Sequence, residues 1–516
     1  MNDRSSAHGL WRRLGMVVLA LMAFGAHGAP AGWMRAETDH FVIHGQSGES
    51  ALRQRAIQLE RFHEAALLLL GIADGKSRTT RRFDVVMLPD TAALAVVRPG
   101  MEKGYAGVYL QCADGSAAFS AEATKVRQAE DDFGQVVLFH EVAHRLMFEY
   151  THRVYPRWFV EGFAEYMSRT TLEGDRVTFG KAPPQADAKL AGRWVGSEVI
   201  AWPDLLRATT GAPKTEADFY FKSWLLTHYL FNDSARAQQL NRYLDRVADG
   251  EDAVAAFEDT TGLQAAGLPL VMERYLRTAA ALRMTGKEAR AVQVRVTPLT
   301  DAQGEVLVKR MVLRVCPGKS HGEKLLAELR TLRQQRETPV PELRLALARA
   351  ELLFGDEAAA EAELASVLAE DPASFEAHHL MGRVLTQQAG KLSGEAREAR
   401  FDEARAHFFS AYRQNKVDAP NLYRLAMALA RRGQDASLAN AARGARALEP
   451  TVPEYAFFEA QVDLAGGDRE RAVRALRPLA ANPHDPAFAA RMRGVITAIE
   501  GGQPVPEVLR LLSRGD

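Results

Sequence analysis

Short runs of alternating hydrophobic and polar residues occur in the first quarter of the chain, and this is the pattern of half-buried β-strands. His40–His44 and Arg81–Leu88 are two such runs, and Gly104–Gln111 and Ser116–Ser120 flank the pair Asp114-Gly115, which favours a hairpin turn. These segments predict a small sheet. Its edge strand could hold an extended peptide through backbone hydrogen bonds.

Apolar residues at helical spacing dominate much of the remaining chain. Helices are expected at Ser50–Leu70, Val126–Tyr150, Ala217–Phe231, Ser234–Ala248 and Gly267–Arg283. The second of these helices is apolar over much of its surface and should be buried. The valine-rich runs Ala291–Thr297 and Glu305–Cys316 predict a hairpin that joins two larger parts of the chain.

From about residue 341, paired alanine-rich helices repeat with regular punctuation. Pro420, Pro453 and Pro486 lie 33 residues apart, close to the period of about 34 residues in tetratricopeptide repeats. Residues matching that repeat's spacing of alanine and larger apolar positions are Ala360, Leu364, Val367 and Pro372, and again Ala404, Phe408 and Ala411. Four or so units would stack into a curved solenoid that binds proteins. An irregular helical bundle is the alternative.

The length and the first residues of the chain indicate its domain organisation. A chain of 516 residues exceeds one typical core. Arg12 and Arg13 precede the apolar run Leu14–Phe24, which predicts a signal peptide over residues 1–28 and a periplasmic or secreted protein, in keeping with a Gram-negative bacterium. We expect a domain at 29–285, a connecting segment at 286–338 with a hairpin and a helix, and a repeat domain at 339–516. No membrane span is expected after signal cleavage, because no later apolar run is long enough.

Charge and cysteine content narrow the chemistry. Lysine plus arginine and aspartate plus glutamate number 65 each, so bulk charge gives no case for nucleic acid as a partner. Cys112 and Cys316 are the two cysteines, and they could form one disulfide bond in an exported chain. Neither lies near a histidine motif, so a cysteine nucleophile is the weaker interpretation.

A candidate metal site lies in the buried helix expected at Val126–Tyr150. The segment His140–His144 is an H-E-x-x-H motif, which places two imidazoles on one helical face, where they can chelate one ion. Zinc is the expected ion, because it suits neutral imidazoles and its catalytic sites use three protein ligands. Glu141 would then act as general base on a water molecule. The alternative is an amphipathic helix with two partly buried histidines.

A third ligand is expected from the stretch Trp158–Tyr166, a second helix that follows a turn at Pro156. Sixteen residues separate His144 from Glu161, which is enough for helix, turn and helix. If the two helices pack as an antiparallel pair, Glu161 comes back to the histidines. The sequence therefore predicts a site of His140, His144 and Glu161.

Together these residues resemble the gluzincin metallopeptidases, in particular the bacterial peptidase-MA-like proteins and, more distantly, the zinc aminopeptidases. The resemblance covers about residues 40–283 and rests on His140–His144 combined with Trp158-x-x-Glu161-Gly-Phe-Ala-Glu165-Tyr. It implies that Glu161 is the third zinc ligand and that Glu165 hydrogen-bonds a ligand histidine, as ligating imidazoles require. An exchange of roles between Glu161 and Glu165 stays open, as does a contribution from His152. A metzincin site is excluded, because Met147 and Tyr150 occupy the positions of its glycine and third histidine.

The same resemblance implies an oxyanion-stabilising tyrosine in a Tyr-x-Lys context. Tyr220-Phe221-Lys222 stands 59 residues after Glu161 and fits this position, with Tyr229 and His228 as further candidates. The substrate strand Gly-x-Met-Glu-Asn of the aminopeptidases is absent, since Gly107–Gln111 has the glycine without the acid. Endopeptidase and exopeptidase activity therefore both stay open.

The sequence as a whole predicts an α+β, mostly helical fold, in which a gluzincin-type metallopeptidase domain precedes a TPR-like α-solenoid. The expected activity is zinc-dependent hydrolysis of peptide bonds in a protein or peptide substrate, with the repeats recruiting a protein partner. The alternative is a periplasmic scaffold or assembly protein that works through its repeats and keeps a catalytically silent peptidase-like domain. Intact Glu141 argues against this alternative, because a pure binding domain has no need for a general base.

Overall fold

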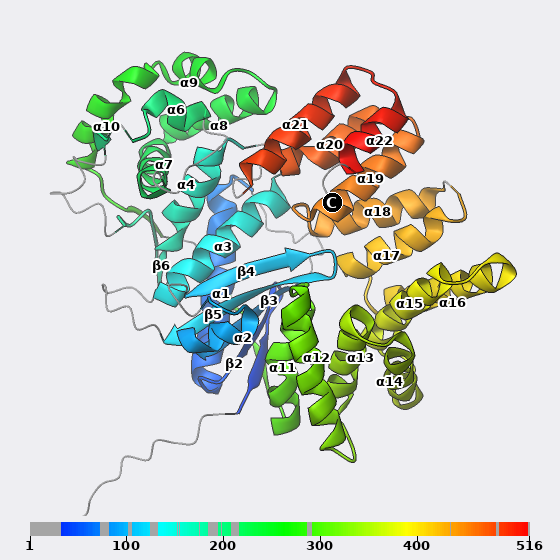
Figure 1. The fold of residues 1–516 in the computed structure, drawn as a ribbon. Helices are drawn as coiled ribbons and strands as arrows, with labels where there is room; N and C mark the ends of the chain where they lie inside the picture. Colours follow the sequence, from blue (N-terminus) through cyan, green and yellow to red (C-terminus); the bar gives the residue numbers. More distant parts are fainter. Residues whose placement is uncertain are drawn as a thin grey trace, which may run out of the picture. The chain divides into compact units, whose positions relative to one another are not determined.

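The computed structural model describes residues 32–72, 82–101, 106–123, 133–151, 153, 155–174, 176–183, 195–197, 199–207, 216–285, 291–433, 435–480 and 485–513 (Figure 1). The expected signal peptide at 1–28 and the imidazole of His152 lie outside these residues. The same holds for residues 126–132 of the expected long helix. Among the helices within the described ranges, none is both long and apolar enough to cross a membrane.

A six-stranded mixed sheet forms from the first strands of the chain and one later strand. The strands are Met34–Glu37 (β1), Phe41–Gly45 (β2), Phe83–Asp90 (β3), Gly107–Cys112 (β4), Gly115–Ala123 (β5) and Arg295–Pro298 (β9), in the order β4-β5-β3-β2-β1-β9. β2, β3 and β5 pair in parallel, and the other pairs are antiparallel. The expected strands and the hairpin between β4 and β5 are confirmed. β4 lies at the edge of the sheet, as a peptide-holding strand requires.

Side chains along β3 alternate between two hydrophobic cores. Phe83, Val85 and Met87 share one core with helices Glu49–Leu69 (α1) and Phe133–Tyr150 (α3). Val86 and Leu88 share the other core with helices that come much later, Asp301–Leu313 (α11), Lys319–Gln334 (α12) and Pro341–Phe354 (α13). Both faces of this strand are therefore covered, which explains why its sequence is an almost continuous apolar run.

The hairpin expected at residues 291–316 is wrong. Its first half contains β9, which pairs with β1 of the sheet, but Glu305–Cys316 lies mostly in α11. The helix begins with a capping box in which the Thr300 side chain accepts from the Gln303 backbone and the Gln303 side chain accepts in return. This cap satisfies free backbone donors and starts a helix, and buried Val306, Leu307, Met311 and Val312 then follow helical spacing.

A helical lobe and a small sheet follow α3. The helices are Arg157–Ser168 (α4), Trp202–Arg207 (α6), Glu216–Phe231 (α7), Ser234–Ala248 (α8), Ala253–Thr261 (α9) and Leu268–Leu276 (α10), and the strands are Thr171–Glu173 (β6), Arg176–Phe179 (β7) and Leu282–Thr285 (β8). The helices expected at 217–231 and 234–248 are confirmed. The one expected at Gly267–Arg283 is shorter, because Arg283 pairs with Thr178 in the sheet. Short helices also occur at Thr91–Ala93 (η1), Leu94–Val97 (α2) and Ala265–Gly267 (η4).

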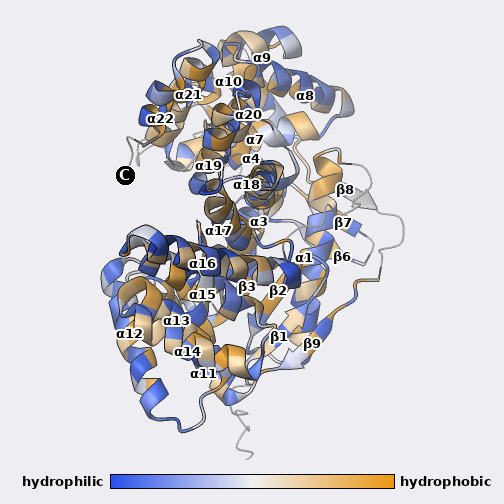
Figure 2. Cartoon of the chain, turned by 90° about the vertical axis from the view of Figure 1, so that its right-hand side faces the viewer, coloured by the Kyte–Doolittle hydropathy of each residue, from blue (hydrophilic) through white to orange (hydrophobic). Residues whose placement is uncertain are grey.

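The C-terminal region consists of consecutive helix pairs with hydrophobic and polar sides (Figure 2). After α13, the helices are Glu357–Glu370 (α14), Phe375–Gly390 (α15), Gly394–Gln414 (α16), Ala419–Ala430 (α17), Ala436–Leu448 (α18), Pro453–Ala465 (α19), Arg469–Ala480 (α20), Pro486–Glu500 (α21) and Val505–Ser513 (α22). Pro420, Pro453 and Pro486 each lie in the first turn of a helix. Proline is tolerated there because the backbone N–H that it lacks would have no helical partner. The spacing of 33 residues thus marks the first helix of successive pairs.

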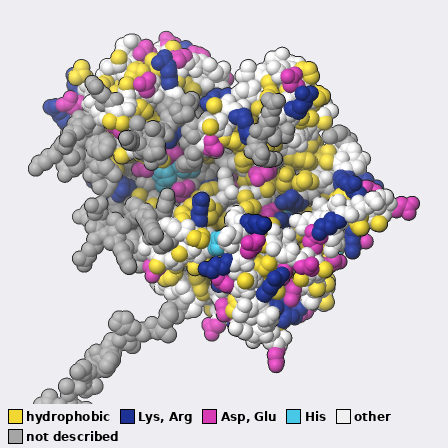
Figure 3. Space-filling model, viewed as in Figure 1, with side chains coloured by type: hydrophobic (Ala, Val, Ile, Leu, Met, Phe, Trp, Pro, Cys, Tyr) yellow, Lys and Arg dark blue, Asp and Glu magenta, His cyan; other side chains and the backbone are white. Residues whose placement is uncertain are grey.

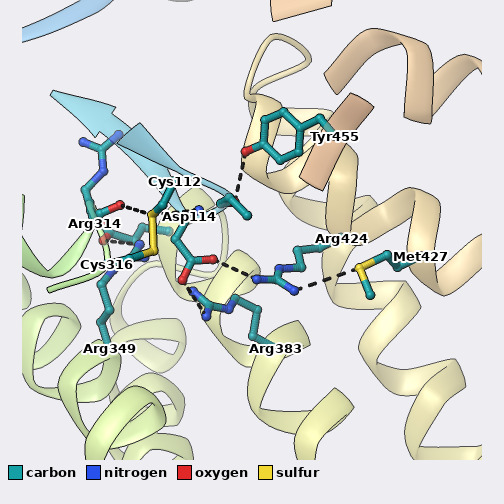
Figure 4. Close-up of polar contacts among 11 residues, drawn as sticks. Cys112, Asp114, Arg314, Cys316, Arg349, Arg383, Arg424, Met427 and Tyr455 are labelled. Atoms are coloured by element: carbon teal, nitrogen blue, oxygen red, sulfur yellow. Dashed lines mark hydrogen bonds and ion pairs between the residues drawn. A yellow bond between two sulfur atoms is a disulfide. The ribbon is translucent and has the colours of Figure 1, made fainter. Parts of the chain in front are cut away.

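The tip of the β4–β5 hairpin contacts the first helices of several pairs (Figure 4). The carboxylate of Asp114 forms ion pairs of 2.9 Å with Arg383 on α15 and with Arg424 on α17. Tyr455 on α19 donates a hydrogen bond of 3.0 Å to the backbone oxygen of Ala113. The sheet and the repeats are therefore joined through polar contacts at this turn.

A disulfide bond strengthens the same region. Cys112, the last residue of β4, is bonded to Cys316, which follows α11. This pairing, which the sequence left open, closes a loop with a sequence separation of 204 residues. Cross-links that close long loops restrict the unfolded chain and stabilise the fold.

Candidate metal centre

The two histidines of the H-E-x-x-H motif lie side by side on α3. Their Nε2 atoms are 3.0 Å apart, as expected for residues one helical turn apart on the same face. His144 is buried and His140 is partly exposed. The pair therefore presents two imidazole nitrogens to one point.

Glu161 on α4 is brought to that point from the other side. Its Oε2 atom lies 3.5 Å from the Nε2 atom of His140 and 3.5 Å from that of His144. The Glu161 side chain is fully buried. A buried carboxylate is costly unless charge or hydrogen bonds compensate it, so this position points to a cation.

Gly162, the next residue, explains how α4 comes close to α7. A Cβ atom at Gly162 would lie 2.3 Å from the Thr227 hydroxyl and 2.4 Å from the backbone oxygen of Ser223. These distances are far below any real contact, so only glycine permits this approach of the two helices. The glycine of the Glu161-Gly162 pair thus has a packing role beside the carboxylate.

The donor set fits a zinc ion. A tetrahedral zinc with bonds of about 2.0–2.1 Å holds its ligand atoms roughly 3.3 Å apart. The three separations here are 3.0, 3.5 and 3.5 Å. Two imidazoles and one carboxylate also match the ligand types of catalytic zinc, which leave a further position open.

Glu165 lies one turn after Glu161 and contacts the opposite nitrogen of His140. Its Oε1 atom is 3.2 Å from Nδ1 of His140, so it can fix the tautomer and orientation of the ring. Glu161 faces both Nε2 atoms, whereas Glu165 faces only Nδ1. The geometry thus favours Glu161 as the candidate metal ligand and Glu165 as the residue that orients the ring of His140.

The electrostatic potential at His140 is negative, because two carboxylates lie next to its ring. Burial lowers the pKa of His140, but hydrogen bonds to Glu161 and Glu165 outweigh it and raise that pKa well above its ordinary value. The two carboxylates thus stabilise positive charge at the imidazole. The same field would stabilise a metal cation held by the Nε2 atoms.

Tyr220 on α7 is close to this cluster. Its ring centroid lies 6.5 Å from that of His140, so the tyrosine is a neighbour of the candidate metal-binding residues. The further candidates lie elsewhere. The Nδ1 atom of His228 is 2.7 Å from the Tyr275 hydroxyl, and the ring of Tyr229 packs edge-on against the ring of Tyr275.

Lys222, the lysine of the Tyr-x-Lys segment, is a structural residue. Its ammonium donates to the backbone oxygens of Ser197 and Ile200 at 2.7 Å each and pairs with Asp218 at 3.0 Å. The side chain is fully buried. It therefore fastens the segment before α6 to α7 and does not face the histidines, unlike Tyr220.

A cavity of about 350 Å³ adjoins the cluster. Its lining residues are Glu141, His144, Arg145, Phe148 and Glu149 of α3, Tyr109 and Gln111 of β4, and Leu448, Glu449, Pro450, Thr451, Pro478 and Leu479 of the repeats. Figure 3 shows histidine side chains in a recess of one face of the molecule, with acidic side chains nearby. The general-base candidate and the edge strand thus border one space, and a substrate chain could reach both.

The sequence reasoning missed the charged residues of this cavity. Arg145 donates a hydrogen bond of 2.9 Å to Glu149, and both side chains are buried. Glu141, Arg145 and Glu149 are spaced by four residues along α3, so they share one helical face. The spacing of these three residues predicts that they share a helical face, whereas nothing local in the sequence connects Glu449 to the site.

A second histidine cluster lies near the N-terminal end of the sheet. His40 Nδ1 is 2.7 Å from Glu60, His63 Nε2 is 3.0 Å from the Tyr150 hydroxyl, and the two imidazoles stack with centroids 4.0 Å apart. Glu60 and Tyr150 thus each bind one nitrogen of a ring. The second nitrogen of each ring, Nε2 of His40 and Nδ1 of His63, is buried without a hydrogen bond among the described residues.

Comparisons with known proteins give little further information. No protein-family model matches the chain, and no curated protein matches it. Among solved structures, the chain is similar to a thermophilic TPR protein of Thermus thermophilus, at 18% identity and a TM-score of 0.32, over 37% of this chain and 97% of that one. The described fold is mostly helical, with a small sheet and consecutive helix pairs.

Proposed function

We propose that this chain is an exported zinc-dependent peptidase, with His140, His144 and Glu161 as the metal ligands. The observation that carries the proposal is the convergence of two imidazole nitrogens and one buried carboxylate oxygen within 3.0–3.5 Å. The support of His140 by Glu165 adds to it, since ligating histidines are held at their other nitrogen. Of the activities compatible with such a site, peptide hydrolysis agrees best with a neighbouring cavity bordered by a β-strand edge.

In this proposal each residue of the site has its own chemical role. A zinc ion bound by this donor set supplies Lewis-acid activation of a peptide carbonyl and of a water molecule. Glu141 on the cavity wall takes the proton of that water and passes it to the leaving amine. Tyr220 donates a hydrogen bond to the carbonyl oxygen as negative charge develops there. β4 binds the extended substrate through its backbone.

We also propose that the protein is located in an oxidising compartment outside the cytoplasm and that its repeats bind a protein partner. A disulfide between Cys112 and Cys316 is typical of exported proteins, and it agrees with a signal peptide at residues 1–28. First helices of the repeat pairs contact the hairpin tip of this same chain through Asp114 and Ala113. We therefore expect a protein partner to bind the repeats outside these contacts.

The decisive experiment compares the zinc-loaded wild type with Glu141→Gln on a peptide library. The variant should keep stoichiometric zinc and lose about 10²- to 10⁴-fold in kcat, because it lacks only the base. Glu173→Gln, at an exposed position of β6, serves as the matched control and should keep full activity. Equal turnover by Glu141→Gln, or protein that does not hold zinc, would contradict the mechanism. A wild type that holds zinc and cleaves no peptide would instead favour the catalytically silent scaffold.

A further inference from the structure

The cavity beside the histidines has a wall that comes from the repeats. The end of α18, the loop that follows it and one turn of α20 contribute Leu448–Thr451, Pro478 and Leu479, and the opposite wall is α3. The catalytic candidates and the repeats therefore enclose a single space.

Two side-chain contacts hold this wall against the sheet. The Ser116 hydroxyl donates to Glu449 at 2.9 Å, and the Thr451 hydroxyl donates to the Gln111 side chain at 2.8 Å. The disulfide and the Asp114 ion pairs lie at the adjacent end of the hairpin. The loop is thus a fixed part of the cavity in the folded chain.

Acidic side chains outnumber basic ones on the walls of the cavity. Glu149 and Glu449 are two buried carboxylates, and they face one guanidinium, that of Arg145. Burial raises the pKa of Glu149, and the charge of Glu449 raises it further, so the two carboxylates lie close enough to interact. With three acids, Glu141 included, and one arginine in its lining, the pocket carries a surplus of negative charge and favours a cationic group.

Much of the remaining lining is apolar, although Gln111 and Thr451 also border the cavity. Phe148 of α3 and Leu448, Pro450 and Leu479 of the repeats line the space next to the charged residues. A cavity of about 350 Å³ falls within the usual range of binding pockets, about 300–1,000 Å³. Lysine and arginine combine a long apolar stem with a charged end, and they bury the stem while keeping the charge paired. Their side chains therefore match both the apolar walls and the acidic residues.

We propose that this cavity is a specificity pocket for a lysine or arginine side chain of the substrate, and that the repeats supply its acidic wall through Glu449. The inference rests on the proposed peptidase function, because it identifies the class of substrate of that site. The stem packs between Phe148 and Leu448, and the cationic end pairs with the carboxylates of Glu449 and Glu149. The repeats thus select the substrate within the catalytic cleft itself.

The test uses full-length protein and peptide sets that differ at a single position, which holds lysine, arginine or uncharged norleucine. Dissociation constants are measured by calorimetry on the wild type without added metal, and kcat/KM is measured on the zinc-loaded wild type. We expect lysine and arginine peptides to bind and react at least tenfold better than the norleucine peptide. Glu449→Gln keeps an acceptor for Ser116 and should remove most of this preference.

The matched control is Glu454→Gln, an exposed carboxylate at the start of α19, which should keep the preference. Equal binding of lysine and norleucine peptides would contradict the proposed specificity pocket, whether or not cleavage occurs. A preference that survives Glu449→Gln would overturn the contribution of the repeats. A Glu449-dependent preference in binding, without any cleavage by the wild type, would refute the peptidase proposal and leave the cationic pocket standing.

Discussion

Asp114 and Arg383 form an ion pair with 2.9 Å between a carboxylate oxygen and a guanidinium nitrogen, although one lies in a hairpin turn and the other on a repeat helix. Their side chains are only 6% and 8% exposed. Arginine side chains lower the pKa of Asp114 far below its ordinary value, against the effect of burial. The pair therefore belongs to a buried charge cluster that joins the sheet to the repeats.

Asp114→Asn should destabilise the fold strongly. The substitution leaves the buried guanidinium of Arg383 without its charge partner, and breaking a buried pair in this way costs about 3–5 kcal/mol. Urea unfolding curves measure the change. Asp402→Asn is the matched control, because Asp402 also pairs with two arginines, Arg405 and Arg432, but at the surface. Its unfolding midpoint should stay close to that of the wild type, and equal losses in the two variants would refute the role of burial.

Glu165→Ala should weaken zinc binding by about 10- to 100-fold, because the Nδ1 atom of His140 loses the group that orients the ring. Competition with a chromophoric chelator gives the affinity. The exposed Glu173→Ala variant should bind zinc like the wild type. Unchanged affinity in Glu165→Ala would show that the ring is held by packing alone.

Tyr220→Phe should lower kcat by about 10²-fold with little change in KM, since the lost hydrogen bond forms only as charge develops on the substrate oxygen. Tyr229→Phe removes a hydroxyl from the same helix on a ring that packs against Tyr275, and it should keep wild-type kcat. Steady-state kinetics on a cleaved library peptide separates the two. A fall in kcat for Tyr229→Phe alone would move the oxyanion role to that residue.

Stability should fall as the pH drops below about 6.5, in part because of His44. Burial lowers the pKa of His44 to about 4, whereas an unfolded histidine titrates near 6.5. The unfolded state therefore takes up the proton first, and stability that is present above pH 6.5 is lost between about 6.5 and 4. At pH 5 this residue should account for roughly 2 kcal/mol.

Urea unfolding at pH 7.5 and at pH 5 measures that loss, and His44→Gln should show a smaller difference between the two conditions. Burial also lowers the pKa of His321, which lies on α12 and is less buried, so His321→Gln should change the pH dependence less than His44→Gln does. Identical pH dependence in His44→Gln and the wild type would contradict the assignment.

The sequence by itself determined the local elements and most of the candidate metal centre. The histidine pair follows from helical spacing, and the return of Glu161 follows from a turn at Pro156 between two apolar helices. The prolines at 420, 453 and 486 marked the first helices of the repeats because proline is favoured in the first turn of a helix. Such features depend on neighbours within a few tens of residues, so a linear pattern carries them.

Only the tertiary structure decided how distant segments meet. The valine-rich segment at 305–316 was predicted as a strand of a hairpin, and it is a helix because it caps at Thr300 and covers the second face of the sheet. In the folded chain, the hairpin tip contacts the repeat helices, Cys112 is bonded to Cys316, and Glu449 lines the cavity beside His144. These contacts join residues more than two hundred positions apart, and they depend on how the whole chain packs, which no local periodicity encodes.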